Sequence, residues 1–289
     1  MMELTSDMSP VTRVLVADGA AALAAAGVST PRLNAEVLLA TACGINRTAL
    51  HARANQPVPS VAGQMFESFL RRRARREPLQ YIVGRQEFWS LDFVVTPDVL
   101  VPRPETELLV ELAVAIAGEG EAQALAICDL GTGSGCLAVA LARELPEARI
   151  VAVDQSAPAL CVARENARRH AVERVSFVEG DWLRPLAGAG FDLIVCNPPY
   201  IASGELDRLQ PELAWEPRAA LDGGADGFDC IRRVIDAAAV QLTRRGWLLM
   251  EIGAAQGAAV LEAASAAALR DASVRADYAG QPRVLLARR

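Results

Sequence analysis

The sequence predicts an α/β protein in which a Rossmann-like, doubly wound parallel sheet follows a small helical domain. From about residue 104 onward, apolar segments of strand length alternate with segments of helical periodicity, an order typical of a parallel sheet covered by helices. Residues 1–84 instead consist of Ala-rich segments with a helical period. We therefore predict domains at 1–84 and 104–289, joined by a linking segment at 85–103.

Short apolar runs in the second region are predicted to be buried strands. They are residues 124–128, 149–153, 175–178, 191–196 and 247–252, with helical patterns at 157–169 and 228–242 between them. The last two runs, 273–278 and 283–287, are separated only by Ala-Gly-Gln-Pro. Because this gap is too short for a parallel crossover, the runs are predicted to form an antiparallel hairpin at the sheet edge.

In the amino-terminal region the helical period is interrupted at residues 27–31, 43–44 and 56–59, so several short helices are predicted. The last of them ends in a run of arginines at 71–76. Two interpretations of this run stay open: a solvated helix end and a surface that binds a partner. Apolar and polar residues then alternate at 86–95, which predicts a β-hairpin between the two domains.

Composition argues against several classes of protein. The chain has 289 residues, 52% of them hydrophobic, and a net charge of −6, so we expect a packed core and no broad surface for duplex nucleic acid. All 29 basic residues are arginine, which excludes a Walker A lysine and a Schiff-base lysine. The two histidines, His51 and His170, have no neighbouring ligands at metal-binding spacing, so no metal is predicted.

The cysteines and the amino terminus predict a cytoplasmic protein. Six cysteines occur singly, without a C-x-x-C pair, as expected for reduced thiols. The first residues include Glu3 and Asp7, with no basic segment ahead of an apolar one. Uninterrupted apolar stretches of about 18 residues do not occur, so neither export nor a membrane span is expected.

The run 191–196 is followed directly by Asn197-Pro198-Pro199-Tyr200. Two prolines cannot continue the strand, so the motif lies at its carboxyl end, where ligands bind in open α/β sheets. Prolines lack an N–H, and Asn197 adds a side-chain carbonyl, so acceptors are available for a planar group that carries an NH2. Tyr200 offers an aromatic face for stacking. A Pro-rich turn with Asn as a local cap is the alternative that stays open.

A glycine-rich loop follows the first predicted strand and reads Asp129-Leu130-Gly131-Thr132-Gly133-Ser134-Gly135. Asp154 ends the second strand, about 20 residues beyond the last glycine. Glycines allow close approach of a ligand, and an acid at this position can accept hydrogen bonds from ribose hydroxyls. A dinucleotide site would have its third glycine one residue later, where Cys136 stands. The loop therefore predicts an adenosine ligand other than NAD.

Asp181 and Trp182 come just beyond the third predicted strand. They could supply a carboxylate for an adenine amino group and an aromatic face for stacking. A helix cap with a core tryptophan is the equally weighted alternative.

Together, these motifs resemble those of the S-adenosylmethionine-dependent amino methyltransferases, which methylate planar NH2 groups of bases or of glutamine. The segments at 77–84, 87–91, 101–107 and 215–227 are further similar to the bacterial release-factor glutamine methyltransferases. They include the blocks Glu-Phe-Trp and Pro-Arg-Pro-Glu-Thr-Glu, which the general methyltransferase motifs lack. The resemblance covers nearly all of residues 70–289 and, more loosely, the helical region before it.

This resemblance implies a seven-stranded sheet with an antiparallel last strand, S-adenosylmethionine as cofactor and S-adenosylhomocysteine as product. The three loop glycines would approach the methionine part of the cofactor, Asp154 its ribose and Trp182 its adenine. The residues expected to bind the cofactor are Asp129, Gly131, Thr132, Gly133, Ser134, Gly135, Asp154, Asp181, Trp182 and Asn197.

The implied substrate is the glutamine of the Gly-Gly-Gln tripeptide in class-1 peptide chain release factors. A carboxamide nitrogen is a poor nucleophile because its lone pair is delocalised, and the sequence shows no strong base, so catalysis is expected from positioning. Asn197 Oδ1 and the Pro198 carbonyl would accept the two amide N–H bonds. Pro199 and Tyr200 complete the expected catalytic residues.

Arg103, Glu105 and Thr106 are expected to bind the substrate together with the Asn-Pro-Pro-Tyr residues. An ordinary helix start, with Pro and acids in its first turn, is the alternative that sequence alone favours for 103–106.

Two other functions stay open. An amino methyltransferase acting on an exposed adenine or guanine would share the Asn-Pro-Pro-Tyr motif, since a flipped base also presents a planar NH2, although the net negative charge counts against it. A non-enzymatic sensor of an adenosine ligand would not need the amide acceptors. For the favoured function we expect a monomer that binds release factors, in part through residues 1–84 and the arginine run, and no stable association with nucleic acid or membrane.

Overall fold

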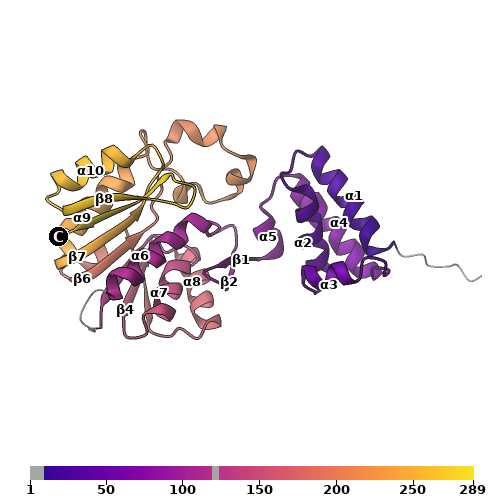
Figure 1. Cartoon of the computed structure of the whole chain (residues 1–289), viewed down its shortest axis with the longest axis horizontal. Helices are drawn as coiled ribbons and strands as arrows, with labels where there is room; N and C mark the ends of the chain where they lie inside the picture. The colour runs from indigo at the N-terminus through magenta and orange to yellow at the C-terminus, as the bar shows by residue number, and fades with distance from the viewer. Residues whose placement is uncertain (1–9, 119–123) are drawn as a thin grey trace, which may run out of the picture. The chain divides into compact units, whose positions relative to one another are not determined.

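The chain divides into two units, each with its own core (Figure 1). The computed structural model describes residues 10–118 and 124–289. The helical unit contains residues 1–84 together with 211–215, and the sheet unit contains 85–210 and 216–289. Glu3 and Asp7, on which the prediction about export rests, lie outside the described residues.

Short helices joined by loops containing Gly or Pro build the helical unit. They are α1 (Thr12–Ala25), α2 (Pro31–Ala42), α3 (Arg47–Ala52), α4 (Ser60–Ala74) and α5 (Leu79–Val83). Pro31 opens α2, and Asn46 caps α3 by accepting a hydrogen bond from the Ala49 N–H at 2.8 Å, as expected at helix starts. The predicted interruptions lie at the junctions between these helices.

Leucines from α1, α2 and α3 pack with Phe66 of α4 in the core of this unit. Gly19 of α1 faces the Phe66 ring, where a Cβ atom would lie only 2.7 Å from Phe66 Cζ. The absence of a side chain at Gly19 therefore lets α1 and α4 approach closely.

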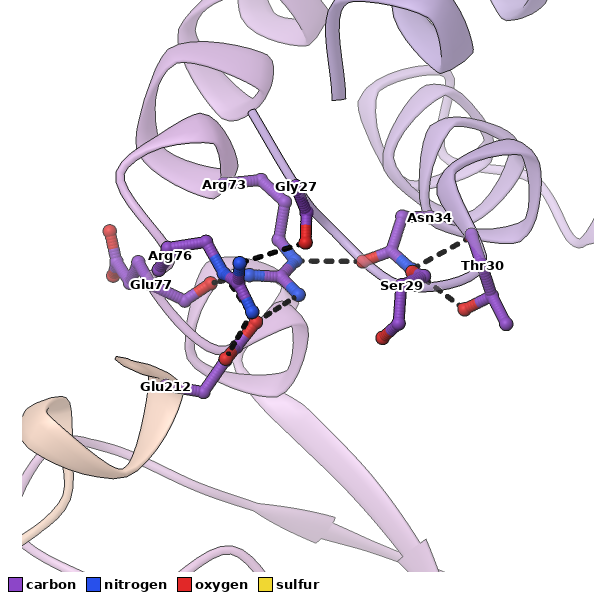
Figure 2. Close-up of polar contacts among 8 residues, drawn as sticks. All are labelled: Gly27, Ser29, Thr30, Asn34, Arg73, Arg76, Glu77 and Glu212. Carbon is purple, nitrogen blue, oxygen red and sulfur yellow. Dashed lines mark hydrogen bonds and ion pairs between the residues drawn. The ribbon is translucent and has the colours of Figure 1, made fainter. Parts of the chain in front are cut away.

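A short segment that is distant in sequence, η4 (Pro211–Trp215), completes the helical unit. Its Glu212 accepts hydrogen bonds from Arg73 and Arg76 at 2.8 Å (Figure 2). These ion pairs explain why the segment belongs to the helical unit, although the residues on either side of it in the chain belong to the sheet unit.

The arginine run at 71–76 is not a free basic surface. Besides the two arginines held by Glu212, Arg72 donates from Nε to Glu77 at 2.8 Å. Arg71 and Arg75 are exposed. Most of the positive charge that the sequence places at this helix end is thus neutralised within the unit.

A seven-stranded sheet, in the order β5-β4-β3-β6-β7-β9-β8, forms the centre of the sheet unit as far as the structure describes it. Its strands are β3 (Ala126–Leu130), β4 (Arg149–Asp154), β5 (Val175–Glu179), β6 (Phe191–Cys196), β7 (Leu242–Glu251), β8 (Arg270–Ala276) and β9 (Pro282–Arg288). Strands β3 to β7 pair in parallel, whereas β9 is antiparallel to both β7 and β8. The predicted fold class, including the reversed last strand, is confirmed.

Helices cover both faces of this sheet (Figure 1). They are α6 (Glu107–Gly118), α7 (Cys136–Glu144), α8 (Ala157–Arg169), α9 (Asp229–Gln241) and α10 (Gly257–Ala266). In β6, Leu193 and Val195 face the core that contains α6 and α7, while Ile194 and Cys196 face the core that contains α9 and α10. The strand is apolar from Leu193 to Cys196 because both of its faces are covered.

The predicted hairpin consists of β1 (Arg85–Phe88) and β2 (Leu91–Val94), which pair antiparallel and belong to the sheet unit. Asn166 of α8 bonds both backbone groups of Val94 and also donates to the Ser134 carbonyl at 2.8 Å. This buried asparagine thereby ties the hairpin to the glycine-rich loop. None of the described helices is both long and apolar enough to cross a membrane.

Candidate active site

A cavity of about 230 Å³ lies at the carboxyl ends of the central parallel strands, within the sheet unit. Gly131 and Gly133 line it from the loop after β3, Asp154 from the end of β4, Trp182 from beyond β5 and Asn197 from the end of β6. Parallel strands place their carboxyl ends at one edge of the sheet. Residues far apart in sequence therefore converge on one cavity.

The glycines of the loop adopt backbone conformations that other residues rarely reach. Gly131, Gly133 and Gly135 have φ angles of 72°, 54° and 80°, in the left-handed region that glycine tolerates best. A Cβ atom on Gly135 would lie 3.0 Å from the Cβ of Ala163 in α8. A Cβ on Gly131 would lie within 4.0 Å of both the Trp182 ring and the Asn197 carbonyl. Because Gly131 has no side chain, no Cβ atom stands between the loop backbone and the Trp182 and Asn197 groups.

Asp154 connects the end of β4 to the glycine-rich loop. Its Oδ2 accepts a hydrogen bond from the Gly133 N–H at 2.9 Å, and its Oδ1 accepts one from the Ser156 N–H at 2.9 Å. Burial raises the pKa of this carboxyl above its usual value. Each oxygen retains acceptor capacity, so Asp154 can shape the loop and still bind a hydroxyl in the cavity.

Asp129 supports the glycine-rich loop from the side that faces away from the cavity. It is fully buried, and the Thr132 hydroxyl donates to its Oδ2 at 2.6 Å. Burial raises the pKa of Asp129 to about 7. Ser134 is also buried, and its carbonyl accepts the hydrogen bond from Asn166. The side chains of these three loop residues therefore lie beneath the backbone that faces the cavity.

Beyond β5, Trp182 is half-buried in a left-handed conformation, with φ at 52°. Asp181 accepts a hydrogen bond from Arg233 of α9 at 2.5 Å and lies 3.5 Å from Arg184. Arg233 lines the cavity as well. Asp181 is predicted to bind an adenine amino group, but its carboxylate is paired with Arg233. The sequence motifs do not include Arg233.

At the end of β6, the Asn197 side chain is held by Thr106, from the short helix η1 (Pro104–Thr106). Asn197 Nδ2 donates to Thr106 Oγ1 at 3.0 Å. Because the amide nitrogen is used in this way, Oδ1 is left as the acceptor. The structure therefore brings together two predicted substrate-binding residues separated by about half of the sheet unit's sequence.

Glu251, at the end of β7, joins these residues into one hydrogen-bond network. Thr106 Oγ1 donates to Glu251 Oε2 at 2.7 Å, and the Tyr200 hydroxyl donates to Oε1 at 3.3 Å. Glu251 is 2% exposed, and burial raises its pKa to about 6. Burial and the neighbouring carboxylate likewise raise the pKa of Tyr200.

The backbone of the Asn-Pro-Pro-Tyr motif is held from two sides. Gln256 donates from Nε2 to the Tyr200 carbonyl at 3.1 Å. Gly223 approaches from the other side, where a Cβ atom would lie 2.9 Å from the Pro199 carbonyl oxygen. Pro198 is buried. A glycine is needed at position 223 because any side chain would collide with this turn.

The other two predicted substrate-binding residues have different surroundings. Arg103 donates to Glu216 at 2.5 Å, and Glu216, which is 7% exposed, also accepts a hydrogen bond from the Val101 N–H. Glu105 is exposed. Arg103 thus joins the segment before α6 to the segment that follows η4. Among the described residues, Glu105 forms no hydrogen bond with the Asn197 network, but its charge raises the pKa of Glu251.

Known proteins resemble both parts of the chain. Two family models match it, the PrmC N-terminal domain at residues 15–84 and the Methyltransferase small domain at residues 106–224. The release factor glutamine methyltransferase of Geobacter sulfurreducens is 46% identical over 264 residues, which are 91% of this chain and 91% of that protein. The chain belongs to the release factor glutamine methyltransferase family. The relative from Moorella thermoacetica is also 46% identical, over 92% of this chain and 94% of its own length.

Among solved structures, a methyltransferase from Pyrococcus furiosus has the same fold, with a TM-score of 0.53 at 17% identity over 75% of this chain and 97% of that one. Membership of the release factor glutamine methyltransferase family confirms the resemblance drawn from the motifs and shows that the protein is an enzyme of the methyltransferase class. The predicted cofactor, S-adenosylmethionine, agrees with this class.

Sequence reasoning did not find Glu251, Glu216 or Arg233. Glu251 carried a usable signal, because it is an acid at the end of an apolar run whose neighbours in the sheet also end in site residues. Glu216 lies in the segment 215–227 that resembles the family, but its pairing with Arg103 and the role of Arg233 depend on partners that are distant in sequence.

Proposed function

We propose that this protein transfers a methyl group from S-adenosylmethionine to the side-chain amide nitrogen of the glutamine in the Gly-Gly-Gln motif of class-1 peptide chain release factors. The orientation of Asn197 carries the proposal. Its Nδ2 is bound to Thr106, so Oδ1 is available to accept an N–H bond from a substrate amide. Family membership supports the same substrate.

The cavity fits the cofactor because the glycine-rich loop leaves room for a ligand beside Trp182 and Asn197. Gly131, Gly133 and Gly135 would hold its methionine part, Asp154 its ribose and Trp182 its adenine. Asp129, Thr132 and Ser134 support the loop, and Asp181 positions Arg233 beside the same cavity. When bound, S-adenosylmethionine supplies an electrophilic methyl group on a sulfonium sulfur.

The protein's own contribution to the chemistry is positioning. The carboxamide nitrogen of a glutamine is a weak nucleophile, because its lone pair is delocalised into the carbonyl. Asn197 Oδ1 and the Pro198 carbonyl would accept its two N–H bonds and fix the direction of the nitrogen, while Tyr200 encloses the amide. Fixing a reactant in a near-attack orientation can lower the activation barrier by several kcal/mol, and by about 7–11 kcal/mol at most.

Release factor recognition is assigned to residues 1–84, with residues 85–103 joining this domain to the methyltransferase domain at 104–289. Supporting this assignment, a family model separate from that of the catalytic region matches residues 15–84. Of the arginine run, the exposed Arg71 and Arg75 are offered to a partner. Arg71 lies 3.8 Å from the equally exposed Glu67, whereas Arg72, Arg73 and Arg76 are bonded to the more buried Glu77 and Glu212. We further propose a cytoplasmic monomer that acts in translation termination without stably binding nucleic acid.

The direct test is incubation of the purified protein with S-adenosylmethionine and a full-length release factor, followed by mass spectrometry of the Gly-Gly-Gln peptide. The mass of one added methyl group on the glutamine is expected. A factor whose target glutamine is replaced by asparagine serves as the control, together with single-stranded DNA and RNA as alternative acceptors. Methylation of the nucleic acids but not of the factor would overturn the proposal.

A further inference from the structure

The Asn197 side chain is held by two consecutive hydrogen bonds that run in one donor-to-acceptor direction, and the last acceptor sets this direction. It runs from Asn197 Nδ2 to Thr106 Oγ1 at 3.0 Å and from Thr106 Oγ1 to Glu251 Oε2 at 2.7 Å. Thr106 and Glu251 are 3% and 2% exposed. Water therefore has little access to these groups, and each has to be satisfied by the others.

We propose that Glu251 is a positioning residue for methyl transfer: by accepting the Thr106 proton, it holds the Asn197 amide with its oxygen toward the substrate. This inference rests on the proposed function, because it assigns the residue that orients the amide acceptor. Glu251 does not itself touch the reacting amide.

The direction follows from the donor and acceptor capacities of the three groups. An ionised carboxylate only accepts hydrogen bonds, so the Thr106 hydroxyl has to donate toward Glu251. The same hydroxyl then presents a lone pair to Asn197, and only the NH2 end of an amide can meet it. If Asn197 were turned over, its NH2 would face the NH2 of the substrate, and no hydrogen bond could form between them.

Tyr200 fixes the other oxygen of the carboxylate. Its hydroxyl donates to Glu251 Oε1 at 3.3 Å, while its backbone carbonyl is held by Gln256. Both oxygens of Glu251 thus face donors. An amide in place of the carboxylate would turn its own NH2 toward one of these hydroxyls and reverse the direction of that arm.

The charged and titratable groups that face Glu251 are few. Tyr200 contacts it, Arg283 favours its ionised form, and Glu105 acts in the opposite sense. The thiol of the neighbouring Cys196 is neutral here, since burial holds its pKa well above its usual value. Arg283 is itself bonded to Asp277 at 3.1 Å. With burial as the largest influence, the pKa of Glu251 is about 6, so the carboxylate loses its acceptor-only character when the pH drops below this value.

Protonated Glu251 could donate to Thr106, whose hydroxyl would then be free to donate to Asn197 Oδ1 and turn the amide over. The sign is therefore fixed: the ionised form is active, and kcat rises with pH through about 6. Substrate binding that does not depend on this amide is unaffected.

The experiment measures kcat, KM for full-length release factor and cofactor affinity across this pH range, with the cofactor saturating so that titration of Asp129 and Asp154 beside the cofactor loop does not enter kcat. Glu251→Gln should lower kcat at neutral pH by about tenfold or more and remove the acidic limb of the kcat profile. Cofactor affinity should change by less than about twofold. A Gln variant that keeps the acidic limb would overturn the proposal, because glutamine does not titrate. An unchanged kcat in both this variant and Thr106→Val would overturn it as well.

Thr106→Val supplies an independent test if the Gln variant does not fold. It removes the hydroxyl between Glu251 and Asn197 at nearly constant volume, so the same loss of kcat and of the acidic limb is expected. The double variant should be no slower than the slower single variant, because both substitutions interrupt one network. Additive losses would mean that Glu251 does not act through Thr106.

Asp192→Asn is the matched control. Asp192 lies near the amino end of β6, away from the cavity at the carboxyl end, and its two oxygens accept hydrogen bonds from Thr243 Oγ1 and the Ala126 N–H. Its removal should leave kcat and the acidic limb unchanged. The two hypotheses fail separately. An inactive wild-type protein would refute the proposed function, whereas an active wild type whose kcat is unchanged by both Glu251→Gln and Thr106→Val refutes only the positioning role.

Discussion

The arginine cluster of the helical unit and the candidate active site of the sheet unit bury charged groups in different ways. In the helical unit, Arg73 is 4% exposed and its guanidinium donates to Asn34 Oδ1, the Glu77 carbonyl and Glu212 (Figure 2). Although burial opposes ionisation, hydrogen bonds from Arg76 and Arg73 lower the pKa of Glu212 to about 2. Each charge in this cluster meets an opposite charge or a polar partner.

In the sheet unit, Glu216 is likewise paired with an arginine, Arg103, but the two buried carboxyls Asp129 and Glu251 bond neutral partners instead. Asp129 is held by Thr132, and Glu251 by Thr106 and Tyr200. Burial raises their pKa values to about 7 and about 6. Strongly perturbed carboxyls gathered at one end of a sheet are typical of a functional site, whereas the compensated cluster of the helical unit is typical of a structural one.

The largest expected effect is on the structural cluster. Arg73→Ala should destabilise the helical unit by about 3–5 kcal/mol, because removing one partner of a buried ion pair leaves the other without compensation. Hydrogen exchange of α2 and α4 in the full-length protein measures this loss. Arg75→Ala, at an exposed arginine of the same helix end, should change stability by no more than about 0.5 kcal/mol. If both substitutions lowered the stability of the helical unit equally, the buried cluster around Arg73 would not be the structural element that we infer.

On the functional side, Asn197→Ala should lower kcat by about 10²-fold or more, because the reacting amide loses its orientation. Cofactor affinity should be nearly unchanged, since the glycine-rich loop and Asp154 remain. Asn197→Asp keeps an acceptor but cannot donate to Thr106, so it should be only partly active. Single-turnover rates with saturating cofactor check this prediction, and a folded Asn197→Ala variant with a near-native rate would contradict it.

Asp154→Ala should weaken S-adenosylmethionine binding by about 1.5–3 kcal/mol, the usual contribution of a hydrogen bond to a charged group. Calorimetry measures the affinity directly. The carboxylate also holds the Gly133 N–H, so Asp154→Asn, which keeps one acceptor oxygen, should lose less. Unchanged affinity in a folded Asp154→Ala protein would show that the ribose assignment is wrong.

Much of the fold, and less of the site, could be predicted from sequence. The strand at 191–196 and the helix at 157–169 have the predicted bounds, because apolar runs and caps are local signals. The start of β7 at Leu242 was missed, since Arg244 and Arg245 interrupt the apolar pattern. The pairing of Glu212 with Arg73 joins residues that are 139 positions apart, and no local pattern encodes such a contact.

The smallest expected effect is a difference between the two units in how their stability depends on pH. Glu212 has a lower pKa in the folded state than in the unfolded state, so its stabilising contribution is present above about pH 4.5 and is lost as the pH falls toward 2. Asp129 and Glu251 have raised pKa values, so the unfolded state loses their protons first and the sheet unit becomes less stable as the pH rises from about 4 to 7.

Hydrogen exchange followed separately in each unit, corrected for the intrinsic rate at each pH, measures this difference. As the pH is lowered, the sheet unit should first gain protection, and the helical unit should lose protection only at lower pH. Glu212→Gln should reduce only the loss of protection in the helical unit, where Glu36 also has a lowered pKa, and Asp129→Asn should reduce only the gain in the sheet unit. If the stability of both units changes with pH in the same direction, the difference between a carboxylate paired with arginines and carboxyls bonded to neutral partners does not govern that stability.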